Sequence, residues 1–154
     1  MRMDRFTIKA GEALQEAQRL STSMRHPEIR PLHLLLALTR QDEGIVGPVL
    51  QRPGADPRAV AAAAQERLDA IGRVEGAVDV RVSRELEQVL QEAEAAVKEF
   101  QDDYLSTEHM LLAMTRGADE ASEVLRRFGA TADGILAALR DVRGSSHVTD
   151  QNPE

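Results

Sequence analysis

Four histidines and a run of carboxylates are the residues of this chain that could bind a metal or carry out acid–base catalysis. The histidines are His26, His33, His109 and His147. They form neither the HxxxH nor the HExxH pattern that brings ligands together on one helix face. The carboxylates crowd most closely at Glu85, Glu87, Glu92 and Glu94, a spacing more typical of a solvated helix face than of a catalytic pair. The sequence therefore predicts no metal site, and His33 and His109 are interpreted as packing residues near helix starts.

Nucleotide and nucleophile chemistry lack their usual motifs as well. The lysines are Lys9 and Lys98, and neither follows the GxxxxG frame of a phosphate-binding loop. Cysteine is absent, which excludes thiol catalysis, and no serine sits in a Gly-x-Ser-x-Gly turn. We expect a chain that is not an enzyme and that binds no cofactor of its own.

Composition narrows the class of partner. The 154 residues include 19 basic and 26 acidic side chains, so the net charge of −7 opposes binding to a nucleic-acid backbone. Charges interrupt the first twenty residues, which excludes a signal-peptide core and a membrane-spanning segment there. The lack of cysteine fits a reducing compartment. We expect a cytoplasmic protein with neither nucleic acid nor membrane as partner.

An internal duplication sets the architecture that must position these residues. Residues 6–41 aligned with residues 82–117 give 10 identities in 36 positions, at an offset of 76. The clearest match is between HLLLALTR at 33–40 and HMLLAMTR at 109–116. Two copies of so long a unit favour two helical units packed together over a solenoid. The pattern predicts pseudo-twofold symmetry.

Each unit reads as about four helices. Thr7 and Ser83 are candidate N-caps, each followed by apolar residues at spacings of three and four. The second helix of each unit, from about Pro31 and from Ser106 or Thr107, is apolar on nearly all sides, which indicates a central buried element. Shorter third helices precede Gly54 and Gly129, and fourth helices are expected over about 57–71 and 132–142. We predict an all-α fold of about eight helices.

The same pattern gives domain boundaries. A repeat domain is expected over 1–143, with repeat one at about 6–71, a linker at 72–81 and repeat two at 82–143. The polar, aperiodic segment 144–154 is expected to be a flexible start of a connection to a further module.

Several motifs together resemble the two-repeat N-terminal domain of Clp ATPases. They are MDRFT at 3–7, PLHLL at 31–35 and TEHMLL at 107–112. Within that family, the loop at 74–76 and the segments at 143–144 and 148–154 resemble the ClpB disaggregase branch. The resemblance covers residues 1 to about 143.

The resemblance implies a mobile substrate-recognition domain. It would bind unfolded or aggregated polypeptide and deliver it to the ATPase ring of a homohexamer, in cooperation with the DnaK chaperone system. ATP and Mg are then expected only in ATPase modules outside this chain, and the isolated domain is expected to be a monomer. Two alternatives stay open: an adaptor-docking domain of a ClpC- or ClpA-type protease-coupled unfoldase, and a free-standing regulatory protein of the same fold.

The resemblance also suggests site residues. Polar positions implicated in substrate recognition by the family fall on Thr7, Asp102 and Glu108, and Tyr104 shares the loop of Asp102. The family's apolar groove falls at Glu92, Ala96 and His109, where relatives commonly have bulkier aliphatic residues. Thr7 could instead be a helix cap, and Glu108 could instead stabilise a helix start.

Overall fold

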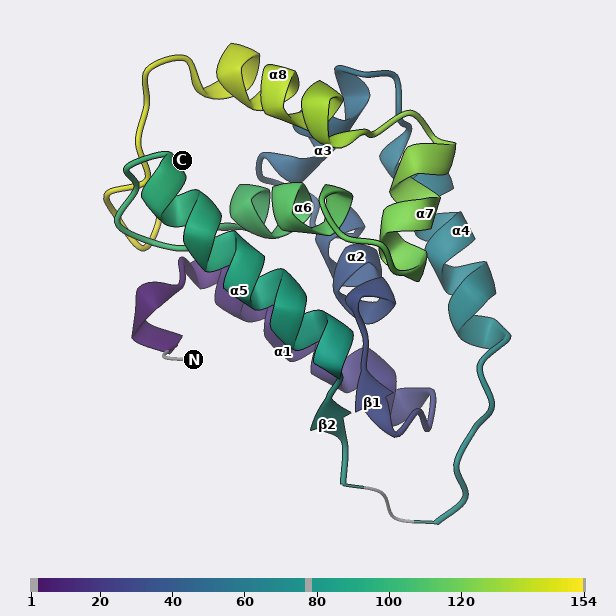
Figure 1. Cartoon of the computed structure of the whole chain (residues 1–154). Coiled ribbons are helices and arrows are strands. Elements are labelled where there is room, and N and C mark those ends of the chain that lie inside the picture. Colours follow the sequence, from purple (N-terminus) through teal and green to yellow (C-terminus); the bar gives the residue numbers. More distant parts are fainter. Residues whose placement is uncertain (1–2, 77–78, 154) are drawn as a thin grey trace.

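The computed structural model describes residues 3–76 and 79–153, and it is almost entirely helical there (Figure 1). Within these ranges it contains eight α-helices, which confirms the predicted fold class. The first repeat holds a 3₁₀ turn (Met3–Arg5), α1 (Ile8–Ser23), β1 (Glu28–Ile29), α2 (Pro31–Thr39), α3 (Val46–Gln51) and α4 (Pro57–Asp69). The second holds β2 (Arg81–Val82), α5 (Arg84–Glu99), α6 (Thr107–Thr115), α7 (Glu120–Arg127) and α8 (Ala132–Arg143).

Helix starts follow the capping residues of the sequence. The hydroxyl of Thr7 accepts a hydrogen bond from the Ala10 amide at 3.2 Å, and the hydroxyl of Ser83 accepts one from the Leu86 amide at 3.1 Å. Each satisfies an amide of the first helical turn that has no partner within the helix. The predicted starts of α1 and α5 are thereby confirmed.

The second helix of each repeat lies at the centre. Leu35 in α2 and Leu111 in α6 have no exposed surface, and their helices are buried on nearly every side. Such helices can be apolar all round because other helices, rather than water, surround them. In Figure 1, α2 and α6 lie between α1 and α5 on one side and α3, α4, α7 and α8 on the other.

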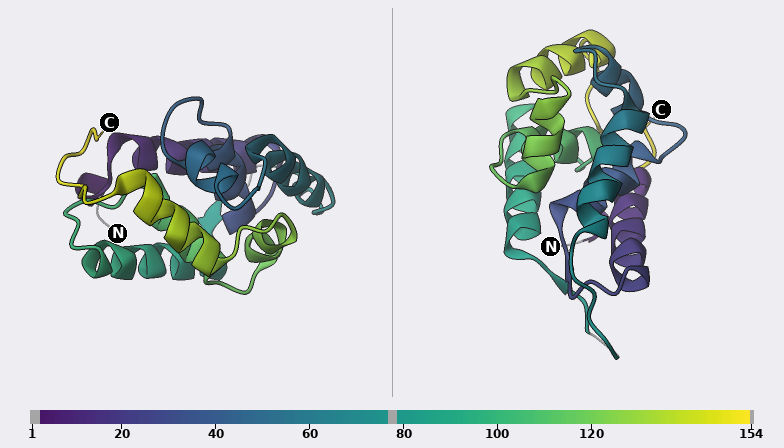
Figure 2. Two further views of the ribbon diagram at one scale, coloured as in Figure 1. Left: turned by 90° about the horizontal axis from the view of Figure 1, so that it is seen from above. Right: turned by 90° about the vertical axis from the view of Figure 1, so that its right-hand side faces the viewer.

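Contacts between the repeats obey a pseudo-twofold relation. Helix α3 of the first repeat packs on α8 of the second, and the equivalent pair is α7 on α4. The two views of Figure 2 show the two halves of the chain side by side. One apolar cluster runs through both repeats, so the chain has a single core.

The same relation holds for two short parallel pairings that join the repeats. Phe6 pairs with Leu105, and Val82 pairs with Ile29, each pair being the other displaced by 76 residues. The amides of Thr7 and Ser83 donate to the carbonyls of Leu105 and Ile29, at 2.9 and 3.0 Å. In each repeat, the residue before the N-cap of the first helix therefore pairs with the other repeat.

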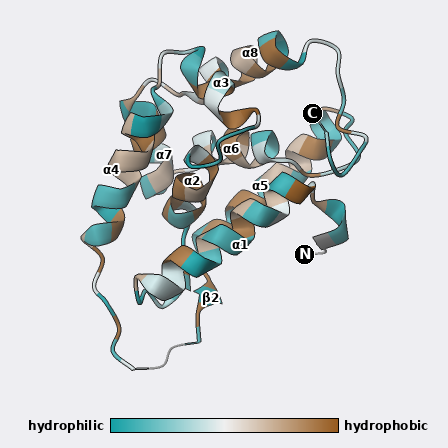
Figure 3. Ribbon diagram, turned by 180° about the vertical axis from the view of Figure 1, so that it is seen from behind, coloured by the Kyte–Doolittle hydropathy of each residue, from teal (hydrophilic) through white to brown (hydrophobic). Residues whose placement is uncertain are grey.

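The surface is mostly polar. Apolar and polar stretches alternate along the outer helices (Figure 3), and among the described residues the large apolar side chains that are exposed are Ile8 and Val82. In the described ranges, no helix combines the length and apolar character needed to cross a membrane. Of the linker expected at 72–81, residues 77–78 lie outside the described residues, and Arg81 and Val82 form β2.

Residues 144–153 differ from the expectation of a flexible segment. They fold back over the loop that precedes α6 and over the start of α1, and the Val148 side chain is only 5% exposed. The sequence pattern could not reveal this packing because a segment held by main-chain hydrogen bonds and one buried side chain has no periodicity.

Candidate functional site

The candidate site lies at the seam between the two repeats, where α1 begins beside the loop that leads into α6. Thr7 caps α1 and donates its amide to Leu105, so its side chain and main chain are both engaged. Asp102 and Tyr104 lie in the loop, and Glu108 lies in the first turn of α6. The parallel pairing of Phe6 with Leu105 fixes the two segments side by side.

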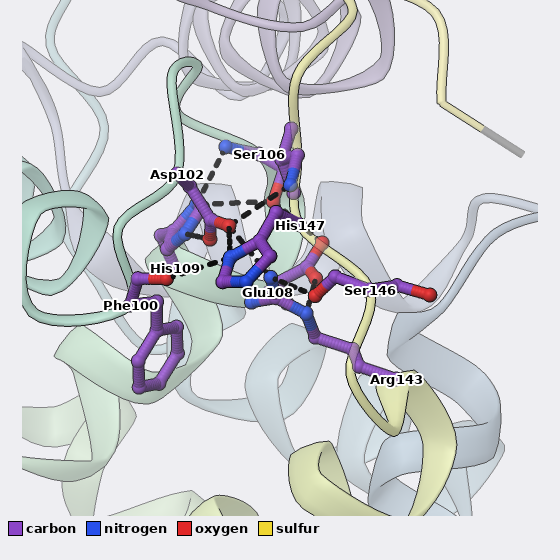
Figure 4. A network of polar contacts seen from close by, with 9 residues as sticks. Phe100, Asp102, Ser106, Glu108, His109, Arg143, Ser146 and His147 are labelled. Carbon is purple, nitrogen blue, oxygen red and sulfur yellow. Dashed lines mark hydrogen bonds and ion pairs between the residues drawn. The ribbon is translucent and has the colours of Figure 1, made fainter.

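Asp102 is the centre of a buried hydrogen-bond network (Figure 4). Its Oδ2 accepts from His109 Nε2 at 2.6 Å, and its Oδ1 accepts from Arg143 Nη2 at 2.7 Å and from the Val148 amide at 2.9 Å. Burial alone would raise the pKa of this carboxyl, but the hydrogen bonds from Arg143, Val148 and His109 outweigh it and lower the pKa. Asp102 is therefore held as a carboxylate, with both oxygens occupied.

Arg143, the last residue of α8, binds two acidic groups and the chain that follows it. Besides Asp102, its guanidinium faces Glu108, with Nε 3.4 Å from Oε2, and donates to the Ser146 carbonyl at 2.9 Å. It also lies over the Phe100 ring, 5.3 Å from the centroid. One cation between two carboxylates leaves a local charge of −1, so the network still attracts positive charge.

His109 joins the start of α6 to the loop. Its Nδ1 accepts from the Ser106 amide at 2.9 Å, which assigns the ring hydrogen to Nε2, the atom that donates to Asp102. Burial lowers the pKa of His109, against the opposing effect of Glu108 and Asp102. The ring is therefore neutral, and it joins the loop residue Asp102 to the start of α6 by hydrogen bonds.

The segment after α8 crosses the seam, and we call residues 144–151 the strap. Gly144 turns the chain at φ +60°, a conformation that favours glycine. The Val148 carbonyl accepts from the Asp103 amide at 2.7 Å, and the Gln151 carbonyl accepts from the Ile8 amide at 2.7 Å. His147 Nδ1 lies 3.0 Å from the Phe100 carbonyl and donates to it. The strap thus binds both sides of the seam.

Two clefts flank the strap. The larger, of about 730 Å³, is lined by Thr7, Glu108, residues 43–45 before α3 and the strap itself. The smaller, of about 290 Å³, is lined by Phe100, Leu136 and Leu139 on the opposite side. Arg143, Ser146 and His147 belong to both linings, so these residues form the wall between the clefts.

The four polar residues that the family resemblance suggested differ in their exposure to solvent. Thr7 and Glu108 line the larger cleft, and Asp102 lies beneath the strap with no exposed side-chain surface. Tyr104 is half-buried in the same loop, and its amide faces the Val148 carbonyl at 3.4 Å. The structure thus brings these four residues to one seam.

The expected groove at Glu92, Ala96 and His109 is not a surface groove in the structure. Ala96 and His109 have no exposed surface, because Ala96 lies in the core and the His109 ring lies in the Asp102 network. Glu92 is exposed and lines a separate cleft of about 430 Å³ between α5 and the end of α6. The family resemblance, rather than the helical spacing, placed Ala96 and His109 at the groove. Neither side chain is exposed in this structure, and their part in client binding stays a prediction.

Sequence reasoning missed Arg143 at the end of α8 and the strap residues that complete the seam. The strap makes its contacts through His147, Val148 and Gln151, and the sequence gives only one weak signal of them, a lone valine in a polar segment. Among the residues that the structure describes, histidines and carboxylates nowhere gather in a group able to hold a metal ion.

Fold and seam together define an N-terminal domain of the Clp type. The sequence profile of the Clp repeat (R) N-terminal domain matches residues 5–128, and the chain belongs to this family.

Among curated proteins, the chain is similar to the chaperone protein ClpB. It is 39% identical over 150 residues to ClpB of Corynebacterium diphtheriae and 37% identical over 150 residues to ClpB of Corynebacterium efficiens. Both alignments cover 96% of this chain and 18% of the relative. The chain thus spans under a fifth of the length of these relatives.

Solved structures share the fold. The Hsp104 N-terminal domain of Candida albicans superposes with a TM-score of 0.83 at 21% identity, covering 95% of this chain and 96% of that one. The N-terminal domain of the ClpV1 ATPase of Escherichia coli gives 0.76 at 21% identity, covering 98% and 91%. The N-terminal domain of ClpD of Arabidopsis thaliana gives 0.67 at 23% identity, covering 92% and 99%.

Proposed function

We propose that this chain is the client-recognition domain of a ClpB-type disaggregase and that it binds unfolded polypeptide at the seam. Thr7, Asp102, Tyr104 and Glu108 are the residues assigned to this site. The family membership and the similarity to ClpB support the class of protein. The bound client would pass to an ATPase ring, and binding itself requires no chemistry from this domain.

The observation that carries the proposal is that a non-helical stretch of polypeptide already lies in the seam. The strap is held by main-chain hydrogen bonds at Asp103 and Ile8 and by one buried aliphatic side chain, Val148. Main-chain recognition of this kind tolerates many sequences, as a site for unfolded proteins must. A client could use the same donors and the same apolar position.

Charge and exposed surface set the strength of this binding. The local charge of −1 around Asp102, Glu108 and Arg143 favours clients with basic side chains, and salt should weaken that part of the interaction. Few large apolar side chains are exposed, and an unfolded client must be ordered when it binds. We expect dissociation constants of about micromolar or weaker.

The remaining parts of the proposal concern the full-length protein. The ATPase ring, a homohexamer, ATP with Mg, and cooperation with the DnaK system follow from the proposed ClpB function and lie outside this chain. The isolated domain is proposed to be a monomer and to lack ATPase activity.

Docking of a folded adaptor, as in ClpC- or ClpA-type unfoldases, is the second candidate. The mostly polar surface favours it, since among the described residues only Ile8 and Val82 offer large exposed apolar side chains. A folded partner needs less apolar contact than an aggregated one, because its recognition surface is already ordered.

Fluorescence anisotropy with two labelled probes separates the candidates. One probe is a reduced, carboxymethylated protein that stays unfolded, and the other is the same protein folded with its disulfides intact. Binding of the unfolded probe alone, weakened between low and high salt, supports client recognition. Absence of binding to the unfolded probe contradicts the proposal.

A further inference from the structure

The strap divides what would otherwise be one continuous channel. Arg143, Ser146 and His147 line the cleft on each side of it, so the two clefts meet where the strap now lies. With the strap displaced, apolar residues such as Phe100 and Leu139 would adjoin the polar seam at Thr7 and Glu108. An extended peptide with both apolar and basic side chains fits such a lining.

The contacts of the strap are those that a client would need. The Val148 amide donates to Asp102, the Val148 carbonyl accepts from Asp103, and the Val148 side chain is buried. The neighbouring His147 ring lies 3.5 Å from Asp102. In this structure the seam therefore binds a basic side chain, His147, next to an aliphatic one, Val148.

The strap is attached more weakly than the elements beneath it. Val148 is buried but is not part of the central apolar cluster, whereas Ser145, His147 and Thr149 are exposed. Segments with few buried apolar contacts and exposed hydrogen bonds open with much less free energy than the core does. The strap can therefore leave the seam while the two repeats stay folded.

We propose that the strap is an internal competitor that occupies the client site, so a client binds only when residues 144–151 are displaced. This inference rests on the proposed function of the seam. The client that replaces the strap is an extended segment in which an aliphatic residue adjoins a basic one. Its apparent affinity is the intrinsic affinity multiplied by the fraction of molecules with the strap open.

The test releases the strap in the intact chain by Val148→Asp, which buries a carboxylate beside Asp102. Thr149→Asp, the same charge change at the exposed neighbouring residue, is the matched control. The first probe is a labelled synthetic peptide with the sequence of residues 143–153, and the second is the reduced, carboxymethylated protein. If about one molecule in ten is open in the unaltered chain, Val148→Asp strengthens binding of both probes about tenfold, and Thr149→Asp leaves it unchanged.

Hydrogen exchange provides an independent readout of release. The Ile8 and Asp103 amides, which the strap protects, should exchange faster in Val148→Asp and at the original rate in Thr149→Asp. Unchanged exchange in Val148→Asp, or faster exchange without tighter binding of either probe, overturns the proposal. If Val148→Asp loses its helical circular dichroism, Val148→Ala serves instead with a smaller gain of about threefold. Loss of folding in both variants also overturns the proposal, because the strap would then be part of the core.

The two probes separate this inference from the function on which it rests. Tighter binding of the strap peptide to Val148→Asp, with no binding of the unfolded protein to any variant, supports an internal ligand and contradicts client recognition. Equal binding of the unfolded protein to all variants supports client recognition and contradicts competition by the strap.

Discussion

His26 and Asp102 occupy the same position in the two repeats, 76 residues apart, and each contacts the histidine seven residues further along. His26 Nδ1 lies 2.9 Å from Nε2 of His33, and Asp102 Oδ2 lies 2.6 Å from Nε2 of His109. Nδ1 of each later histidine accepts a hydrogen bond from the main-chain amide three residues before it, that of Arg30 for His33 and that of Ser106 for His109. The two repeats thus share the same arrangement of hydrogen bonds, but the first repeat has a pair of neutral histidines where the second has a carboxylate and a histidine.

Acid should destabilise the domain in two successive pH ranges. The pKa values of His26, His33 and His109 are lowered chiefly by burial, that of His33 to about 4, so the unfolded chain binds more protons below pH 6.5. The free energy of unfolding should therefore fall as pH drops from about 6.5 to 4, with His33 contributing on the order of 3 kcal/mol. Because the pKa of Asp102 is also lowered, a further loss follows as this carboxyl is protonated at lower pH. The free energy of unfolding, measured with urea at a series of pH values, should show both losses of stability.

His26→Asp tests the origin of the first range. This substitution gives the first repeat an Asp–His pair like Asp102–His109 in the second. A carboxylate at position 26 favours the protonated form of His33 and so raises its pKa. The variant should lose less stability between pH 6.5 and 4 than the unaltered chain. An identical slope in that range would mean that the His26–His33 pair does not govern it.

Asp102→Asn should destabilise the domain by about 3 kcal/mol. The amide has one acceptor oxygen instead of two, so at least one buried donor that now bonds to Asp102 would lose its partner. Asp103→Asn changes the exposed neighbour in the same way and should change stability by less than about 0.5 kcal/mol. Chemical denaturation at neutral pH compares the two. Equal effects would show that the buried network adds nothing.

Leu35→Ala and Leu111→Ala should each cost roughly 2 to 5 kcal/mol, the range for large-to-small changes in a core. The two leucines are equivalent under the duplication, so thermal and urea unfolding should show similar losses. A loss below about 1 kcal/mol at both positions would contradict their placement at the centre of the domain.

Gly144→Ala should cost about 1 kcal/mol, since a side chain is strained at the positive φ with which the strap begins. Gly47→Ala is a useful contrast, because Gly47 lies in α3 with open space where a Cβ would be placed. That variant should be neutral or more stable by roughly 0.5 to 1 kcal/mol. Thermal unfolding should show a lower melting temperature for Gly144→Ala and an unchanged or higher one for Gly47→Ala, and equal losses in both variants would contradict the assigned backbone geometry.

Much of the fold could be predicted because its signals are local. Thr7 and Ser83 begin helices by satisfying their own amides, and the apolar runs around Leu35 and Leu111 require burial on all sides. Because the two repeats have equivalent helices, each helix is predicted twice, and a wrong prediction in one repeat would disagree with its equivalent in the other.

The seam was less predictable because its contacts join residues far apart in the chain. Asp102 is 41 residues from Arg143, and Ile8 meets Gln151 across almost the whole sequence. No periodicity connects such residues, and only the family resemblance pointed to Asp102. Burial of Ala96 and His109 could be predicted from the apolar spacing of their helices, whereas the groove role came from the family resemblance alone.

Amide chemical-shift mapping tests client recognition most directly. An unfolded protein with mixed basic and apolar side chains is titrated into the isotope-labelled chain. We predict shifts that cluster at Thr7, Tyr104 and Glu108 and along residues 144–151, with α4 unaffected. Shifts that cluster on α4 or on the linker at 72–76, or no shifts at a tenfold excess of client, would contradict the assignment of the seam as the client site.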